Sequence, residues 1–150
     1  MTTALREQLQ KRILIIDGAM GTMLQRAGLT AADFGGEELE GCNEMLCVTR
    51  PDVIRNIHEA YLEAGADIIE TNSFGATSIV LAEYSIPHRA RELNLAAARI
   101  AREAADKYST LVKPRFVAGA MGPTTKTLSV TGGVTFDQLV DAYYEQALAL

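Results

Sequence analysis

Three short apolar segments recur along the chain, each followed by the pattern of an amphipathic helix, and this alternation constrains the fold more than any other feature. The segments span residues 13–16, 67–71 and 115–119 and are rich in β-branched and apolar residues, which is typical of buried parallel strands. Because a strand and a helix alternate three times, we predict a parallel α/β fold.

The helices are predicted from apolar residues at helical spacing. One runs over residues 51–64 and ends at Gly65, a second covers residues 88–107, and a capping box at 135–138 opens a third. A polar helix is expected at about residues 4–12. The residues expected to face inward are Val53, Ile54, Ile57, Tyr61 and Leu62 in the first helix, Leu93, Ala97, Ile100, Ala101 and Ala104 in the second, and Phe136, Leu139, Val140, Tyr143 and Ala147 in the third.

The predicted strand-to-helix connections are long, covering about residues 18–48, 73–87 and 120–134. In parallel α/β folds, functional residues collect in such loops, at the carboxyl ends of the strands. The final helical pattern has no closing Gly, Asn or Pro, and three parallel strands leave two edges unpaired. We therefore expect residues 1–150 to be the N-terminal part of an α/β (β/α)8 TIM barrel of about 250–300 residues, contributing its first three βα units. A complete small α/β domain is the alternative.

The charge and hydropathy of the chain argue against several classes of partner. Its formal net charge is -5 and its basic residues are scattered among acids, so we expect no nucleic acid partner. The apolar runs are far shorter than the roughly 20 residues of a membrane span, so we expect no membrane partner. The N-terminus lacks an apolar stretch of the secretory type, and we expect a cytoplasmic protein.

The two cysteines, Cys42 and Cys47, are interpreted as structural thiols in a loop. Their spacing does not match a Cys-x-x-Cys motif, and neither His58 nor His88 lies at a partner spacing for zinc. His58 is expected on the outer ring of the first long helix, without a catalytic role. We predict neither a metal ligand nor a catalytic residue in the chain.

The string that follows the first predicted strand, from Asp17 to Thr22, suits a zwitterionic ligand. Gly18 and Gly21 allow close backbone approach and turn N–H groups toward an anion, while Asp17 is placed to hold a cation such as an α-amino group. A tight turn capped by Asp17 fits the same residues equally well. The glycine spacing matches neither Gly-x-Gly-x-x-Gly nor a P-loop, so a nucleotide site has weak support.

The strings after the second and third predicted strands are also candidates for ligand binding. Thr71 and Asn72 are placed to hydrogen-bond a substrate at the barrel mouth, and Phe74 to form a wall of the pocket. At Gly122, small residues would let a substrate lie against the backbone. Plain turns explain both strings about as well, and are the favoured explanation for the third.

Four strings occur in order along the chain: Ile16–Gln25 (IDGAMGTMLQ), Arg50–Ile54 (RPDVI), Ile57–Phe74 (IHEAYLEAGADIIETNSF) and Val117–Pro123 (VAGAMGP). Taken together, they resemble the homocysteine S-methyltransferase family. Within that family they are most similar to the N-terminal, homocysteine-binding module of the cobalamin-dependent methionine synthases. The resemblance covers about residues 12 to 150.

This resemblance implies a (β/α)8 barrel that binds homocysteine, with a zinc ion in its mouth. It implies that Asp17 binds the amino group of homocysteine and that the backbone around Gly21 and Thr22 holds its carboxylate. The implied substrate-binding set is Asp17, Gly18, Gly21, Thr22, Thr71, Asn72, Phe74 and Gly122. The family's three zinc cysteines and a second acidic partner of the amine follow later strands, beyond residue 150. We therefore expect this segment alone to be inactive and to bind zinc poorly.

The reaction implied is transfer of a methyl group from methylcobalamin to the zinc-activated thiolate of homocysteine, giving methionine. Methylcobalamin would be regenerated from 5-methyltetrahydrofolate by cobalamin- and folate-binding modules of the same longer chain. One alternative is a cobalamin-independent enzyme that uses betaine or S-methylmethionine. From other classes, a nucleotide-binding α/β module and an inactive barrel that serves as a binding piece remain open.

Overall fold

The fold is built around a small parallel sheet. The computed structural model describes residues 3–129 and 132–150. Its strands are β1 (Ile68–Glu70) and β2 (Phe116–Ala118), with Ile69 paired to Val117 at the centre. The helices are α1 (Thr3–Lys11), α2 (Met20–Arg26), α3 (Ala31–Phe34), α4 (Leu46–Thr49), α5 (Pro51–Ala64), α6 (Ser78–Leu81), α7 (Ala90–Tyr108) and α8 (Phe136–Ala149), and the 3-10 turns are η1 (Glu37–Leu39), η2 (Asn43–Met45), η3 (Ala82–Tyr84) and η4 (Pro87–Arg89). The result is a mixed α/β fold with parallel strands, as predicted.

The first predicted strand, residues 13–16, is not a buried strand, and that prediction is wrong. The segment runs parallel to β1 but forms only an isolated bridge between Ile16 and Ile68. Its Ile15 carbonyl accepts hydrogen bonds from Asp67 N (2.7 Å) and Ile68 N (3.1 Å). Ile13 and Ile15 are 88% and 62% exposed, because no element of the described chain covers them. The order of residues 13–16, β1 and β2 is nevertheless that of consecutive βα units.

The three longer helices confirm the predictions from apolar spacing. α5 has the expected bounds and ends at Gly65, whose φ of 112° is readily adopted only by glycine. α8 opens with the expected capping box of Thr135 and Gln138. α7 begins at Ala90 instead of residue 88, because Pro87 starts a 3-10 turn. The long connections, expected to be loops, contain the short helices α2, α3, α4 and α6.

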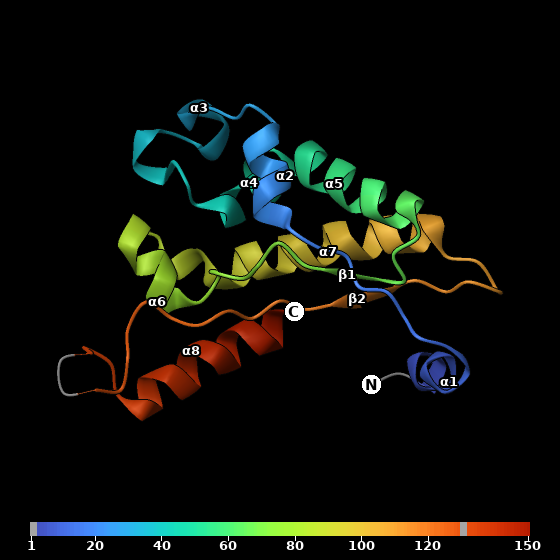
Figure 1. Cartoon of the computed structure of the whole chain (residues 1–150). Coiled ribbons are helices and arrows are strands. Elements are labelled where there is room, and N and C mark those ends of the chain that lie inside the picture. The colour runs from blue at the N-terminus through green and yellow to red at the C-terminus, as the bar shows by residue number, and fades with distance from the viewer. Residues whose placement is uncertain (1–2, 130–131) are drawn as a thin grey trace.

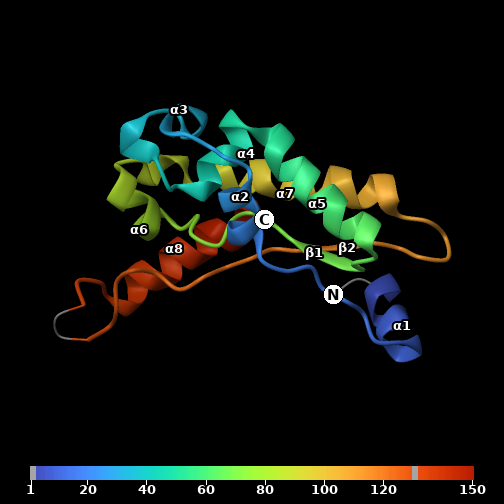
Figure 2. The same ribbon diagram turned by 45° about the horizontal axis from the view of Figure 1, so that its top comes forward.

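The core lies between the helices and one face of the sheet. α5 and α7 pack against each other and cover the same face of β1 and β2 in both views (Figures 1 and 2). The inward residues predicted for α7 are all buried. In α8 the predicted inward face is partly wrong, since Phe136, Val140 and Ala147 are exposed. Its buried residues are Ala142, Gln146 and Ala149, because α8 packs on α7 through this narrow face.

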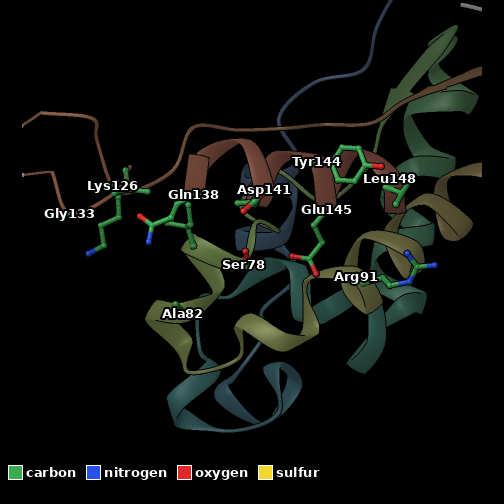
Figure 3. Close-up of a pocket in the computed structure, with 13 residues that line it drawn as sticks. Ser78, Ala82, Arg91, Lys126, Gly133, Gln138, Asp141, Tyr144, Glu145 and Leu148 are labelled. Atoms are coloured by element: carbon green, nitrogen blue, oxygen red, sulfur yellow. The ribbon is translucent and has the colours of Figure 1, made fainter. Parts of the chain in front are cut away.

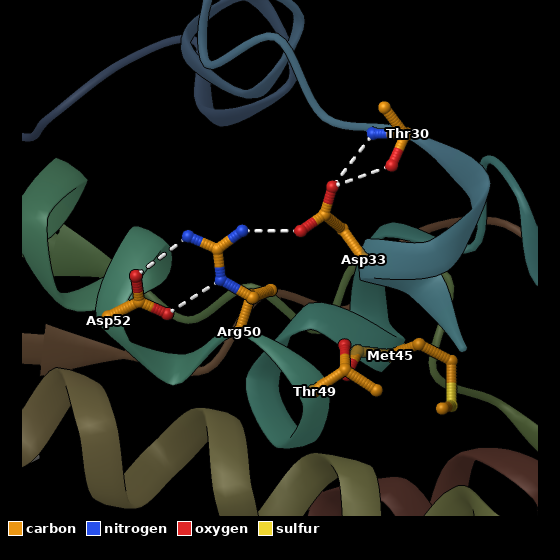
Figure 4. A network of polar contacts seen from close by, with 6 residues as sticks. All are labelled: Thr30, Asp33, Met45, Thr49, Arg50 and Asp52. Carbon is orange, nitrogen blue, oxygen red and sulfur yellow. Dashed lines mark hydrogen bonds and ion pairs between the residues drawn. The ribbon is translucent and has the colours of Figure 1, made fainter.

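Arg50 joins the long first connection to α5 (Figure 4). Its guanidinium forms ion pairs with Asp33 of α3 and Asp52 of α5, the latter at 2.8 Å. Asp33 also accepts hydrogen bonds from Thr30 N (2.9 Å) and Thr30 Oγ1 (3.0 Å). The Thr30 amide and Arg50 lower the pKa of Asp33, and Arg50 lowers that of Asp52, so both carboxylates stay charged at neutral pH. These ion pairs and hydrogen bonds therefore hold the first connection in place against α5.

Asp67 ties the N-terminal segment to the sheet. It is 1% exposed, accepts two hydrogen bonds from Arg12 (2.7 and 2.8 Å) and receives a third from Ile15 N (3.0 Å). These bonds, that of Arg12 above all, lower the pKa of Asp67 to about 2. The pair therefore remains ionised throughout the neutral and mildly acidic range.

We expect Asp67→Asn to loosen residues 12–16 from β1. The free energy of unfolding should fall by about 1–3 kcal/mol, because hydrogen bonds to a charged group are lost. Urea unfolding and faster hydrogen exchange at the Asp17 amide, which bonds Ile68 O, would measure this. Glu103→Gln breaks an exposed ion pair with Arg55 and serves as control, with an expected effect of at most about 1 kcal/mol. Equal losses in the two variants would contradict the role given to Asp67.

None of the helices in the described parts of the chain is long and apolar enough to cross a membrane.

Candidate substrate-binding site

A hollow of about 500 Å³ lies where residues 13–16 and β1 end. It is lined by Asp17, Gly18, Ala19, Met20, Gly21, Asn43, Glu44, Glu70, Thr71, Asn72, Phe74 and Ala120. The strings that follow all three predicted strands thus meet at one place, at the carboxyl ends of parallel strands, where ligands bind in such folds.

Asp17 supplies a half-buried carboxylate to this hollow. Its two oxygens accept hydrogen bonds from the amide of Glu70, at 3.1 and 3.2 Å. Burial raises the pKa of Asp17 to about 6, against the opposing effect of the Glu70 amide. Because burial disfavours the ionised form of this carboxylate, a cation placed beside it stabilises that form. The geometry suits an ammonium group next to Asp17.

The backbone beside Asp17 offers donors for an anion. Residues 18–21 line the hollow, and none of their N–H groups donates a hydrogen bond to any residue that the structure describes. Gly21 leaves open space where a side chain would lie. Thr22, in contrast, is exposed on α2 and does not line the hollow.

Thr71 and Ser73 join the loops that leave β1 and β2. Their hydroxyl oxygens lie 2.6 Å apart, Ala120 N donates to Thr71 Oγ1 (2.9 Å), and Ser73 Oγ donates to Ala120 O (2.8 Å). Thr71 lines the hollow as expected, but its hydroxyl is already bonded within the protein. We conclude that Thr71 holds the two loops in register.

Asn72 faces the hollow from a nearly buried position, being 7% exposed. Its amide nitrogen donates to Asn43 O (2.8 Å) and to Cys47 Sγ (3.5 Å). Its side-chain oxygen accepts no hydrogen bond within the described residues, so it is available to a ligand.

Phe74 forms one edge of the hollow, and Gly122 lies directly behind it. Phe74 is 60% exposed and its carbonyl accepts a hydrogen bond from Gly122 N (2.9 Å). Gly122 is buried against Phe74 and does not itself line the hollow. A Cβ at Gly122 would lie 2.6 Å from the Phe74 ring and 2.7 Å from its carbonyl oxygen. Glycine is required here by this close approach.

Gly122→Ala should therefore displace Phe74 and destabilise the fold by about 1–3 kcal/mol, the usual range for overpacking. Thermal unfolding measures the loss of stability. A change in the amide signal of Phe74 in an NMR spectrum reports its displacement. Gly21→Ala is the control, since nothing lies within 4 Å of its Cβ position. An unchanged melting temperature in Gly122→Ala would contradict the packing described.

Comparison with known proteins identifies the family. The sequence profile described as homocysteine S-methyltransferase matches residues 14–150. The chain belongs to this family.

Solved structures of homocysteine methyltransferase MmuM from Escherichia coli are similar to this family member. Its oxidized form is 31% identical over 81% of this chain and 41% of its own, with a TM-score of 0.67. The metallated form is 25% identical over 97% and 52%, with a TM-score of 0.76, and the apo form is 28% identical over 97% and 48%, with a TM-score of 0.65. The chain thus spans about half the length of these relatives.

Most residues predicted for the homocysteine site of this family lie together. The hollow gathers Asp17, Gly18, Gly21, Thr71, Asn72 and Phe74, with Gly122 behind Phe74 and Thr22 outside. Sequence reasoning missed Asn43 and Glu44. Glu70 opens the candidate string at the end of the second predicted strand, but no role in binding was predicted for it. Glu44 reaches the hollow because its Oε1 accepts a hydrogen bond from Gly75 N (2.7 Å), a contact that local sequence does not signal.

The described residues do not fit a zinc site. They contain no group of three or more His, Cys, Asp or Glu side chains that could hold a metal ion. Cys42 and Cys47 are buried, and burial raises the pKa of their thiols to about 11 and about 12. Zinc binds thiolates, so these neutral thiols are poor ligands. Both cysteines serve the packing of the first connection.

His58 takes no part in the hollow, but its expected place on the outer ring is wrong. The side chain is fully buried, and neither ring nitrogen has a hydrogen-bond partner among the described residues. Burial lowers the pKa of His58 to about 4, so the ring is neutral at physiological pH.

A larger hollow of about 780 Å³ lies between α6 and α8 and holds none of the predicted site residues (Figure 3). Ser78 of α6 and Ala82 of η3 face Gln138, Asp141 and Glu145 of α8 across it, with Arg91 and Lys126 at its ends.

Proposed function

We propose that residues 1–150 form the N-terminal part of a homocysteine-binding barrel, in a protein that transfers a methyl group to homocysteine and gives methionine. The observation that carries this proposal is the half-buried Asp17 carboxylate, with its raised pKa, in a hollow lined by unpaired backbone N–H groups. Membership of the homocysteine S-methyltransferase family and the match to about half of MmuM support it.

Different residues of the hollow would bind different parts of homocysteine. Asp17 would pair with the α-amino group, assisted by Asn72 Oδ1 and the nearby carboxylates of Glu44 and Glu70. No Lys or Arg is among the residues that line the hollow, so the substrate carboxylate would be held by backbone N–H groups near Gly18 and Gly21. Phe74 would cover the aliphatic part. Holding both charged ends fixes the direction of the sulfur, which is the contribution of this segment to catalysis.

Residues beyond this segment would supply the remaining chemistry. A free thiol has a pKa of about 8.5 and must be deprotonated to attack a methyl group, which zinc achieves in sites that hold it. Because the described residues do not fit zinc, we expect purified chain to contain far less than one zinc per molecule and to show no methyl transfer. Atomic absorption measures the metal content, and one zinc per chain would refute this expectation.

The methyl donor is proposed to be methylcobalamin, regenerated from 5-methyltetrahydrofolate by further modules of the same protein. The long insert with residues 34–39 and 43–46 supports this choice over betaine or S-methylmethionine. Cobalamin- and folate-binding sequences in the same gene would support the methylcobalamin proposal, and a gene that lacks them would favour the alternative donors.

Isothermal titration with homocysteine and two analogues tests the binding proposal. We expect L-homocysteine to bind, and 4-mercaptobutanoic acid, which lacks the amine, to bind at least about tenfold more weakly, because Asp17 would be left without a cation. 3-Aminopropane-1-thiol, which lacks the carboxylate, should lose less affinity. Affinity for homocysteine should also fall as the pH is lowered below about 6, where Asp17 takes up a proton. Equal binding of the amine-free analogue, or binding of NAD or ATP in place of homocysteine, would overturn the proposal.

A further inference from the structure

One face of α8 presents two hydrogen-bond donors to the loops that form the hollow. Tyr143 and Gln146 are three residues apart and therefore lie on the same side of the helix. Tyr143 OH donates to Gly122 O (2.9 Å), and Gln146 Nε2 donates to Ser73 O (2.7 Å). Each donor thus holds the loop that follows a different strand.

Gln146 is fixed by a buried polar network. Its Nε2 also donates to Asn94 Oδ1 (3.2 Å), and Asn94 Nδ2 in turn donates to Ala76 O and Ala90 O, both at 2.8 Å. Gln146 and Asn94 are fully buried. Because both groups near Nε2 are acceptors, the amide cannot turn over without placing oxygen against oxygen.

The network leaves one buried polar atom without a hydrogen-bond partner in the described part of the chain, which argues against a purely stabilising role for Gln146. Gln146 Oε1 is buried without a hydrogen-bond partner among the described residues. A buried, unpaired carbonyl oxygen lowers stability, and an apolar side chain of similar size would remove it. Stability alone therefore does not account for glutamine at this position.

The two carbonyls held by α8 lie directly beside the residues that line the hollow. Ser73 stands between Asn72 and Phe74, which both line it. Gly122 donates to the carbonyl of Phe74 (2.9 Å), so the two loops are also bonded to each other. A shift of either carbonyl would move the Phe74 edge of the hollow and the Asn72 side chain.

We propose that Tyr143 and Gln146 are positioning residues for the homocysteine site, holding the loops after β1 and β2 so that Asn72 and Phe74 keep their places. The part that concerns homocysteine rests on the proposed function. The part that concerns the loops rests only on the hydrogen bonds described.

Three variants of the whole 150-residue chain test the proposal. Gln146→Leu and Tyr143→Phe each remove one donor to a loop. Tyr144→Phe removes the same hydroxyl from the neighbouring residue, which is 67% exposed and donates no hydrogen bond in the described structure, and so serves as a matched control. Gln146→Met, which also lacks the donor, replaces Gln146→Leu if that variant fails to fold.

The readouts are the dissociation constant for homocysteine from an NMR titration and the hydrogen-exchange rates of two amides. Ala76 N bonds Ser73 O within the first loop, and Gly122 N bonds Phe74 O between the two loops. We expect about tenfold weaker binding in Gln146→Leu and in Tyr143→Phe, as for the loss of one hydrogen bond, with faster exchange at Ala76 and Gly122 respectively. Tyr144→Phe should match the wild type in both.

Unchanged binding in both test variants would overturn the positioning role, even if their exchange rates rise. Unchanged exchange would show that α8 does not hold the loops. If the wild-type chain binds no homocysteine, the proposed function fails, while the exchange rates still decide whether α8 fixes the two loops.

Discussion

Asp17→Asn is expected to abolish most homocysteine binding and, at neutral pH, to stabilise the ligand-free fold. Burial raises the pKa of Asp17 from 3.8 to about 6, so folding favours the protonated form of this side chain more than the unfolded chain does. The fold therefore loses stability as the pH rises from about 4 through 6, and a neutral Asn avoids that loss. Two pKa units correspond to at most about 3 kcal/mol, and partial solvation reduces the expected gain to about 1–2 kcal/mol.

The loss of affinity should be about hundredfold, because the substrate ammonium would be left without its charged partner. Titration calorimetry and urea unfolding at neutral pH measure the two effects. Glu70→Gln makes the same change of charge in the same hollow at an exposed side chain, and we expect it to change affinity only a few-fold. Wild-type affinity in Asp17→Asn would show that Asp17 is not the amine partner. An equal loss in Glu70→Gln would show that affinity depends on the total negative charge of the hollow and not on a specific pair with Asp17.

His58→Leu is expected to remove much of the acid sensitivity of the fold. The pKa of His58 is about 4 in the folded protein and 6.5 in the unfolded chain, so the unfolded chain binds the proton first. The stability of the wild type is therefore undiminished above about pH 6.5 and falls as the pH is lowered toward 4. By linkage the loss reaches about 2 kcal/mol at pH 5 and about 3 kcal/mol below pH 4.

Urea unfolding at pH 7.5 and pH 5 tests this expectation. The difference between His58→Leu and the wild type should grow by about 2 kcal/mol between the two pH values. At pH 7.5 the variant should already be at least as stable, since two buried nitrogens without partners are removed. The same substitution at exposed His88 is the control and should leave the pH dependence unchanged. A constant difference between His58→Leu and the wild type would disprove the assignment.

The longer helices could be predicted from the sequence because their signals are local. α5 and α7 have apolar stripes of three or more turns, and α5 and α8 carry recognisable residues at their ends. The helices α3, α4 and α6 span four residues each, too few for an apolar period, and are held by tertiary contacts. The segment 13–16 has the composition of a buried strand, but burial depends on neighbours that composition does not describe.

The same distinction applies to the site. Asp17 and Asn72 could be proposed because polar residues directly follow apolar strand patterns. Glu44 could not, since its place depends on a hydrogen bond to Gly75, 31 residues away. Gln146 is a polar residue on the buried side of α8, and only the carbonyl of Ser73, 73 residues away, explains its position.

A crystal structure of the chain with bound L-homocysteine is the most direct test of the proposed site. We expect the amino nitrogen within hydrogen-bond distance of the Asp17 carboxylate, the substrate carboxylate at the backbone of residues 18–21, and the aliphatic chain beside Phe74. Homocysteine bound elsewhere, for example between α6 and α8, with Asp17 left without a ligand contact, would contradict the assignment.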